Sequence, residues 1–198
     1  MEFQDVVRKR RMVRSFEDRP LPREVVERIL SNAQRAPSAG FSQGWAFVVL
    51  EGRDQTRSYW DAVGPDDPAT FQWPDLYRAP LLIVCLSNKQ AYLDRYAEPD
   101  KGWTDRSEAR WPAPYWDIDT GMAALLMLLT AVDAGLGALF FGVPPEKIGR
   151  LRERFGIPPE LHPIGTVAVG YPKPRDPRSG SLKRGRRPTE QVIHRGRW

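Results

Sequence analysis

The stretch Arg10-Arg11-Met12-Val13-Arg14-Ser15-Phe16 places three arginines where an amphipathic N-terminal helix, predicted over residues 3–11, gives way to extended chain. Arginine keeps its charge at physiological pH and offers a rigid fork of N–H donors, so arginines clustered beside a helix end suit a phosphate group. On its own the stretch is equally compatible with a solvated basic surface, or with a nuclear-localisation-like run from Arg8 to Arg11. The rest of the chain has to decide between these interpretations.

The composition predicts one globular domain over residues 1–198. The chain is 41% hydrophobic and 28% charged, and its length is sufficient to bury a substantial core. Its start lacks the basic, apolar and small-residue segments of a signal peptide, and the longest apolar run, residues 121–129, is too short to cross a bilayer. We therefore expect a cytoplasmic protein without a membrane partner.

Cysteine and histidine usage argues against a metal site. The single cysteine, Cys85, excludes an intramolecular disulfide and a cysteine metal cluster, and its place in the apolar run 81–86 predicts a buried strand residue. The two histidines, His162 and His194, lie far apart and have no carboxylate at metal-site spacing. We expect no metal in this protein.

The positive charge is concentrated at the ends of the chain. The net charge is +5, but the tail, residues 172–198, holds nine basic and two acidic residues, so the other residues carry a net −2. A duplex-binding protein usually spreads cationic side chains along one face or one recognition helix. We therefore expect no nucleic-acid partner, although a basic nucleic-acid-binding module that uses residues 8–14 and the tail remains an open alternative.

Periodicity and turn residues divide the chain into alternating elements. Amphipathic or apolar patterns predict further helices and strands, with the tail crossing a surface. The intervening residues 60–116 mix aromatics with prolines and charges and predict a variable, irregular substrate lid, in which Trp103 and Trp111 are candidate substrate contacts. The predicted helices are 22–35, 117–132 and 146–155, and the predicted strands are 45–50, 81–86, 138–142 and 164–171.

A loop of small residues, 36–44, separates the second predicted helix from the first predicted strand and allows a ligand to approach its backbone closely. Its sequence Gly40-Phe41-Ser42-Gln43-Gly44 matches the G-x-S-x-G pattern of a hydrolase nucleophile elbow. That elbow needs a strand before the serine and a helix after it, whereas here a helix precedes and a strand follows. The order of elements argues against a serine hydrolase.

With these parts in order, the chain resembles the nitroreductase family of flavoproteins over nearly its whole length. The N-terminal arginine stretch corresponds to the family element R-R-S-x-R/K-x-F, and the Ala36-to-Trp45 loop to A-P-S-x-x-N-x-Q-P-W. A central apolar helix follows, and then three short motifs. These are Gly135-Leu136-Gly137-Ala138 for G-L-G-x, Gly170-Tyr171-Pro172 for G-Y-P, and Arg184-Gly185-Arg186-Arg187-Pro188 for K/R-x-R-x-P.

The resemblance implies an α+β fold with a central mixed or antiparallel sheet flanked by helices, in a homodimer that binds FMN at the subunit interface. The tail would extend onto the partner subunit. The residues it implies at the cofactor fall into four groups. The phosphate would be held by Arg10, Arg184 and Arg186. The rest of the cofactor would be contacted by Arg11, Met12 and Arg14, with Arg14 at the ring edge. The partner subunit would contribute Pro37, Ser38, Ala39 and Ser42, and backbone near N5 would come from Phe141 and Gly142.

The implied activity is that of an FMN-dependent NAD(P)H oxidoreductase. Hydride from NADPH or NADH would pass through flavin N5 to an electron-poor acceptor, a nitroaromatic or quinone-like small molecule, in a ping-pong mechanism that requires no catalytic side chain. Dehalogenation, desaturation and flavin fragmentation are alternatives on the same fold, and no motif in residues 60–116 identifies a substrate.

Three positions depart from the family pattern. Met12 stands where the family often has serine, which removes a hydroxyl from the cofactor. Phe41 replaces an asparagine and brings an aromatic face toward the flavin, so we expect it to contact substrate. Gly44 replaces a proline. These changes bear more on substrate specificity than on FMN binding.

Overall fold

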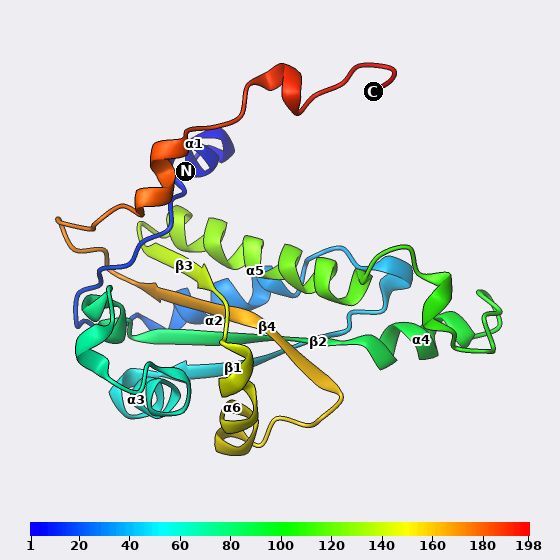
Figure 1. Ribbon diagram of the computed structural model, residues 1–198, viewed down its shortest axis with the longest axis horizontal. Coiled ribbons are helices and arrows are strands. Elements are labelled where there is room, and N and C mark those ends of the chain that lie inside the picture. Colours follow the sequence, from blue (N-terminus) through cyan, green and yellow to red (C-terminus); the bar gives the residue numbers. More distant parts are fainter.

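The centre of the protein is a four-stranded sheet of β1 (Trp45–Glu51), β2 (Leu81–Asn88), β3 (Gly137–Phe141) and β4 (Leu161–Gly170). Its order is β1-β2-β4-β3, and every pair is antiparallel (Figure 1). The structure, a computed structural model, describes the backbone of residues 1–198 and every side chain except that of Pro68. The predicted α+β fold and all four predicted strands are confirmed, with small changes in their bounds.

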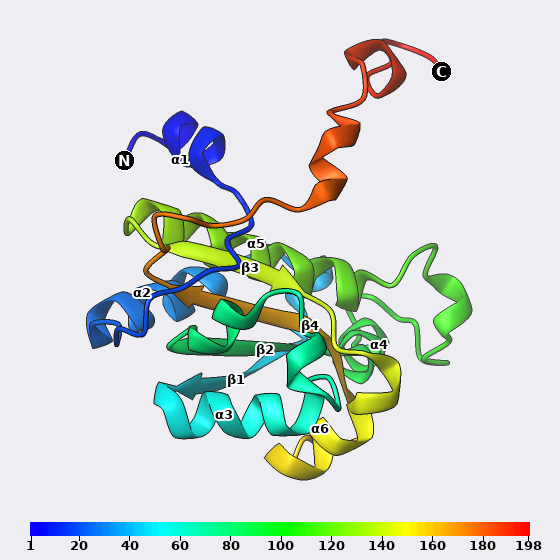
Figure 2. The same cartoon turned by 60° about the vertical axis from the view of Figure 1, so that its left-hand side comes forward.

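Helices cover both faces of the sheet (Figure 2). On one face, α5 (Tyr115–Asp133) packs with α2 (Arg23–Ala33), and Met127, Ala131 and Ile29 belong to the core on that side. On the other face lie α3 (Gly52–Val63) and α6 (Ile148–Phe155). Strand β2 separates two cores, because its side chains alternate between the faces and its residues from Leu81 to Ser87 are all buried.

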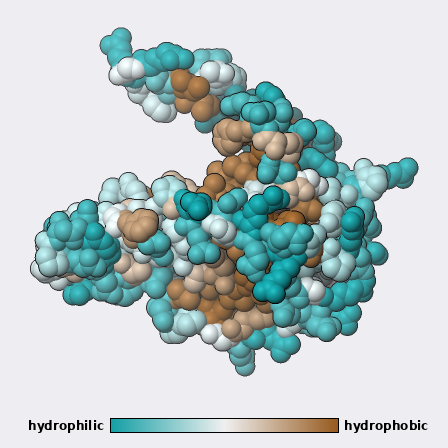
Figure 3. Space-filling model, turned by 180° about the vertical axis from the view of Figure 1, so that it is seen from behind, coloured by the Kyte–Doolittle hydropathy of each residue, from teal (hydrophilic) through white to brown (hydrophobic). Residues whose placement is uncertain are grey.

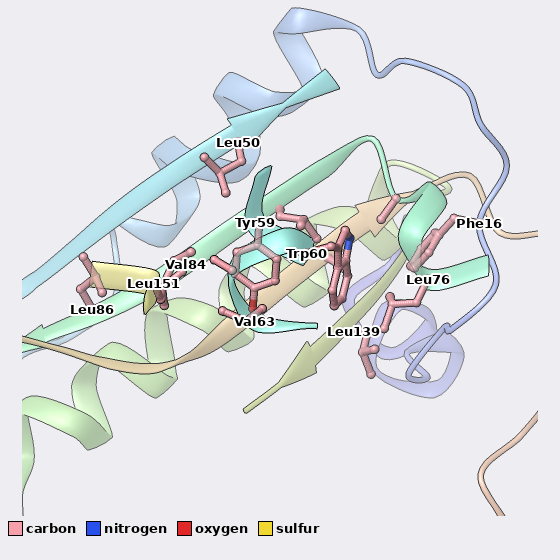
Figure 4. Packing of buried hydrophobic residues seen from close by; sticks show 14 of the residues in the cluster. Phe16, Leu50, Tyr59, Trp60, Val63, Leu76, Val84, Leu86, Leu139 and Leu151 are labelled. Atoms are coloured by element: carbon pink, nitrogen blue, oxygen red, sulfur yellow. The ribbon is translucent and has the colours of Figure 1, made fainter. Parts of the chain in front are cut away.

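The core beneath α3 is rich in aromatic side chains (Figure 4). Tyr59 and Trp60 pack with Val84 of β2 and Leu151 of α6. The Tyr59 hydroxyl shares a hydrogen bond of 2.8 Å with the hydroxyl of Thr166 on β4, which satisfies both buried groups. This core fixes the end of β3, where Phe141 stacks on Trp60 with ring centroids 5.6 Å apart.

Helix α5 is longer than the apolar run that marks it in the sequence. It has 19 residues and a mean hydropathy of 1.2, so its length and composition are those of a membrane span. It nevertheless lies across the sheet with Ala123, Met127 and Ala131 fully buried, as the core helix of a globular domain does. The same helix contacts α2, β3 and α1 (Phe3–Lys9).

The stretch 60–116, expected to be irregular, is more ordered than its composition indicates. Besides β2, whose strand was predicted, it contains the end of α3 and all of α4 (Lys89–Ala97), with short 3-10 turns between the elements. The signal for α3 is present in the sequence, because Thr56, Tyr59, Trp60 and Val63 recur at helical spacing and are all buried. Polar residues between them obscured the pattern.

Both chain ends project from the body. In Figure 2, α1 and the tail leave the same side of the sheet and point away from it in different directions. Val6 of α1 is buried, but Phe3 and Val7 are 64% and 46% exposed. In the tail, Leu182 is 65% and Trp198 is 96% exposed. A single chain thus leaves apolar side chains of both ends uncovered.

Candidate flavin site

The arginine stretch runs as extended chain along the free edge of β3. Met12 forms a parallel bridge with Ala138, and the backbone N–H of Val13 donates to the Ala138 carbonyl at 3.0 Å. A Cβ at Gly137 would lie 2.8 Å from a methyl group of Val13, so the close contact requires glycine there. The edge strand therefore sets the path of the arginines, which places Arg10 and Arg14 on either side of the bridge.

A carboxylate from the base of the tail holds this extended chain. Asp176 Oδ1 accepts hydrogen bonds from the backbone N–H groups of Arg14 at 2.7 Å and Ser15 at 2.8 Å, and Oδ2 forms an ion pair with Arg11. Only 2% of the Asp176 side chain is exposed. The guanidinium of Arg11, which the family resemblance assigns to the cofactor, is thus engaged by the tail of its own chain.

A second carboxylate, Asp75, joins the same segments. It accepts from Lys173 Nζ at 2.7 Å and from the Ser15 hydroxyl at 2.9 Å, and it lies 3.1 Å from the guanidinium of Arg78. The hydrogen bond from Lys173, with a smaller contribution from that of Ser15, lowers the pKa of Asp75 below its ordinary value. Asp75 therefore stays ionised and links the arginine stretch, the tail and the turn Pro74–Arg78.

The guanidinium of Arg14 keeps unused hydrogen-bond donors. It donates to the Met12 carbonyl at 3.2 Å and lies over the ring of Trp73, 5.2 Å from its centroid. Among the side chains that the structure describes, no carboxylate pairs with Arg14 or with the half-buried Arg10. Two arginines with N–H donors left for a ligand, one of them held over an aromatic ring, suit an anionic, planar ligand. Trp73 was missed in the sequence because nothing local links it to Arg14.

The loop after α2 is held in an unusual backbone conformation. Its short 3-10 turn, Ala39–Phe41, starts where the Ala39 N–H donates to Asp119 of α5 at 2.8 Å. Gly40, Phe41 and Gln43 have φ values of 62°, 55° and 49°. The left-handed region is costly for residues with a Cβ, and such strain concentrates at ligand sites. The side chain of Phe41 is 74% exposed at the tip of this loop.

Steric crowding explains why position 44 is a glycine. A Cβ there would lie 2.4 Å from the Tyr92 ring and 2.8 Å from the Asn88 carbonyl oxygen. A proline also carries a Cβ, so it does not fit while Tyr92 occupies this place. Tyr92 in turn donates from its hydroxyl to Asp119 at 2.8 Å. The departure at Gly44 is therefore part of the packing that supports the loop.

At the end of β3 lie Phe141 and Gly142, which the resemblance assigns to a backbone contact. The Phe141 ring packs inward against Trp60 and Tyr59. Gly142 is exposed, and a Cβ built on it meets no atom within 4 Å. The side chain of Phe141 is thus occupied by the core, and contact between this segment and a ligand would involve the backbone.

The candidate substrate residues Trp103 and Trp111 lie in an aromatic cluster behind the loop. Their rings lie 4.9 Å and 4.6 Å from that of Tyr96, and the Tyr96 ring lies directly under Gly40. Their substrate contact therefore stays a prediction, because in a single chain they support the loop. A separate cavity of about 1150 Å³ lies between α3 and the turn Pro74–Arg78, and the candidate cofactor and substrate residues do not line it.

The two halves of the candidate site lie at opposite ends of α5. The loop is tied to Asp119 near its start, and α1 is tied to its end by an ion pair between the N-terminal amine and Asp133. These two aspartates are 14 positions apart in the helix, which at ~1.5 Å per residue is about 21 Å. One chain therefore does not bring Ser38, Ala39 and Ser42 to the arginine stretch.

The remaining candidate residues are exposed. Pro37 lies at the start of the loop, and Arg184 and Arg186 lie on the projecting tail, which Figure 2 shows apart from α1. With the side chain of Pro68 left aside, no group of three or more His, Cys, Asp or Glu residues is arranged to hold a metal ion.

Two key residues of the site were not identified from the sequence. Asp119 lies near the start of the predicted helix 117–132, where the positive helix end alone accounts for a carboxylate, although its neighbours Thr120 and Ala123 mark the buried face of α5. Asp176 is one of only two acidic residues in a basic tail. That isolated charge is the one signal that distinguishes it.

An antiparallel four-stranded sheet with helices on both faces, an arginine stretch on its edge strand and a strained small-residue loop together define the nitroreductase-like class of α+β proteins. The chain belongs to the nitroreductase family, whose model matches residues 7–171. The family resemblance stated from the motifs is confirmed.

Individual relatives agree with this assignment. The chain is 28% identical to an Archaeoglobus fulgidus protein named "Putative NADH dehydrogenase/NAD(P)H nitroreductase", over 83% of this chain and 82% of that one. It is 25% identical to an "NADPH-dependent oxidoreductase" of Staphylococcus aureus, over 98% of this chain and 73% of that one. A solved structure from Desulfovibrio desulfuricans, described as a "putative nitroreductase in complex with fmn", superposes with a TM-score of 0.71 at 22% identity, covering 98% of this chain and 95% of that one.

Proposed function

We propose that this protein is an FMN-dependent NAD(P)H oxidoreductase that works as a homodimer and reduces an electron-poor acceptor such as a quinone or nitroaromatic. The observation that carries the proposal is the separation of the arginine stretch and the loop along α5. Each half has the chemistry of a flavin site, and a second copy of the chain is needed to join them.

The residues present fit FMN. Arg10 and Arg14 have unused N–H donors, and Arg14 lies in a fixed orientation over Trp73. Arg10 would hold the phosphate together with Arg184 and Arg186 of the tail. Arg14 would stabilise the negative charge that collects on a reduced ring. When bound, FMN supplies the hydride chemistry between nicotinamide and acceptor, so the task of the chain is to bind the cofactor, orient it and exclude water.

The surface of α5 supports the dimer. Tyr115, Ile118, Met122 and Leu125 recur at helical spacing and are 36%, 39%, 40% and 47% exposed. Figure 3 shows hydrophobic surface that extends over the middle of the body toward the root of the projecting segments. Such a stripe suits a two-fold contact in which it packs against its own copy.

The two-fold contact also completes the site. A two-fold axis across α5 makes the two copies of this helix antiparallel, so the loop end of one helix lies beside the arginine end of the other. Each loop then reaches the partner's arginine stretch. The tail and α1 have exposed Leu182, Trp198 and Phe3 with which to cover the partner.

The test is the visible absorption spectrum of the purified protein, before and after anaerobic addition of NADPH or NADH. We expect flavin bands that bleach with at least one donor and return with a quinone. Bands that persist with both donors would contradict the nicotinamide-dependent activity. A colourless protein that fails to take up added FMN would contradict the cofactor assignment.

A pair of arginine variants tests the phosphate contact. Arg10→Ala should purify with little FMN, whereas Arg57→Ala, which removes an exposed arginine of α3, should keep its full complement. Equal flavin content in the two variants would count against the role of Arg10.

A further inference from the structure

We propose that Arg95 is a positioning residue, which holds the 38–43 loop in its strained form so that Phe41 is presented to the cofactor site of the partner subunit. The proposal rests on the proposed function and adds a specificity-determining role for Phe41 and for a residue outside the site. Arg95 lies on α4, in the part of the chain between β2 and α5.

Hydrogen bonds on two sides hold the guanidinium of Arg95 in one orientation. Its Nε donates to the Gly40 carbonyl at 2.9 Å. Its two terminal nitrogens donate to the carboxylate of Asp100 at 2.7 Å and 2.8 Å, and one of them also donates to Glu98 at 3.1 Å. A bidentate carboxylate fixes the plane of an arginine fork, so the Nε–H is aimed at the loop before any ligand arrives. Only 25% of this side chain is exposed.

The loop needs support because two of its residues are strained. Phe41 and Gln43 carry a Cβ at φ values of 55° and 49°. Inside the loop, the Ser42 hydroxyl donates to the Ala39 carbonyl at 2.6 Å and the Gln43 N–H donates to the Ser38 hydroxyl at 3.0 Å. These bonds close the turn on itself but do not fix it to the body.

Two contacts from the body supply the fixed points. Asp119 holds the Ala39 N–H at the start of the turn, and Arg95 holds the Gly40 carbonyl at its tip. The Tyr96 ring packs against the same turn, so close to Gly40 that a Cβ there would be 2.6 Å from it. The residue after this anchored carbonyl is Phe41, whose ring is exposed although it is apolar and large. Contacts from Asp119, Arg95 and Tyr96 thus hold a strained backbone in the conformation that exposes the Phe41 ring.

A planar ring held at the tip of a rigid loop suits contact with a planar acceptor or with the flavin that reduces it. If Arg95 were removed, the tip would relax to ordinary backbone angles and the Phe41 ring would turn from this position. The cofactor phosphate, held by Arg10 of the other chain and by the tail arginines, would be unaffected.

The test compares Arg95→Ala with Arg106→Ala in FMN-loaded dimer. Arg106 also lies between β2 and α5 and also pairs with an aspartate, Asp94, but it does not contact the loop. We expect Arg95→Ala to raise KM for menadione about five-fold, the worth of one ordinary hydrogen bond, with FMN content and melting temperature matching those of Arg106→Ala. Amide hydrogen exchange of residues 38–43 should quicken in Arg95→Ala alone.

A double variant shows whether Arg95 acts through Phe41. Phe41→Ala should raise the same KM, and adding Arg95→Ala to it should cause no further change. Additive effects, an unchanged KM in Arg95→Ala, or equal exchange in the two arginine variants would each overturn the proposal. If the wild-type protein binds no FMN, the proposed function fails and the role of Phe41 with it, whereas the exchange comparison still reports the contact between Arg95 and the loop.

Discussion

The carboxylate of Asp176 accepts the backbone N–H of Arg14 at 2.7 Å, although the two residues are 162 positions apart in the chain. This bond joins the root of the tail to the middle of the arginine stretch. Since the same carboxylate also holds Ser15 and Arg11, the two basic ends of the protein are fixed to each other through an acidic residue.

Removing this carboxylate should destabilise the protein. Asp176→Ala leaves two partly buried N–H groups without a partner, and we expect the unfolding free energy to fall by about 2 kcal/mol. Asp176→Asn retains a carbonyl oxygen for the N–H groups and should lose less. Urea unfolding of the two variants checks this, and equal losses would show that the charge pair with Arg11, and not the backbone bonds, is what matters.

Acid should weaken the junction at Asp75. The folded pKa of Asp75 is lowered, so its contribution to stability is present above the ordinary aspartate pKa of 3.8 and is lost as the pH falls through the lower folded value. Asp75→Asn should therefore be less stable than wild type at neutral pH, and the difference should shrink below about pH 4.

The control for Asp75 is Asp61→Asn, since the Asp61 carboxylate makes no ion pair with the described side chains. Denaturation curves at several pH values measure both variants. A constant difference between wild type and Asp75→Asn across this range would contradict the assignment.

The exposed stripe of α5 predicts a charge-sensitive dimer. Leu125→Glu places a carboxylate in the middle of the proposed contact, where desolvation of the charge disfavours association. We expect a shift toward monomer in sedimentation velocity and a parallel loss of FMN. Arg57→Glu places the same carboxylate on the opposite face of the sheet, with a charge change twice as large, and should remain dimeric. Retention of FMN by monomeric Leu125→Glu would contradict a site shared between subunits.

Replacing Gly44 should lower the stability of the protein while Tyr92 is present. Gly44→Ala forces a methyl group against the Tyr92 ring and the Asn88 carbonyl, and we expect a loss of about 1–3 kcal/mol. Gly149→Ala on α6 meets no atom within 4 Å and should be stabilised by about 0.5–1 kcal/mol, because alanine favours a helix. Thermal unfolding separates the two cases.

Much of the fold was readable from the sequence because its elements carry strong local patterns. Strand β2 is a continuous apolar run, and α5 is apolar nearly all round, so both were predicted close to their observed bounds. Helix α4 was not predicted, since only Tyr92 and Leu93 of its nine residues are buried. A helix supported mainly by aromatic contacts from elsewhere has little local signal.

The candidate site was predictable in its motifs but not in its supports. The arginine stretch and the loop are each a single continuous segment, and the residue types in each segment indicate its chemistry. Asp119, Asp176 and Arg95 act on segments that lie 80, 162 and 55 positions away. Such partners follow from the tertiary arrangement of β3, α4 and α5, and no spacing rule identifies them.

In the proposed dimer, the distance along α5 between the loop and the arginine stretch also has a genetic consequence. A subunit with a damaged arginine stretch still offers an intact loop, and a subunit with a damaged loop still offers intact arginines. In a mixed dimer of the two, one interface site receives both lesions and the other receives none. Two inactive alleles of this protein, expressed together, should therefore complement each other to give hybrid dimers with a single working centre.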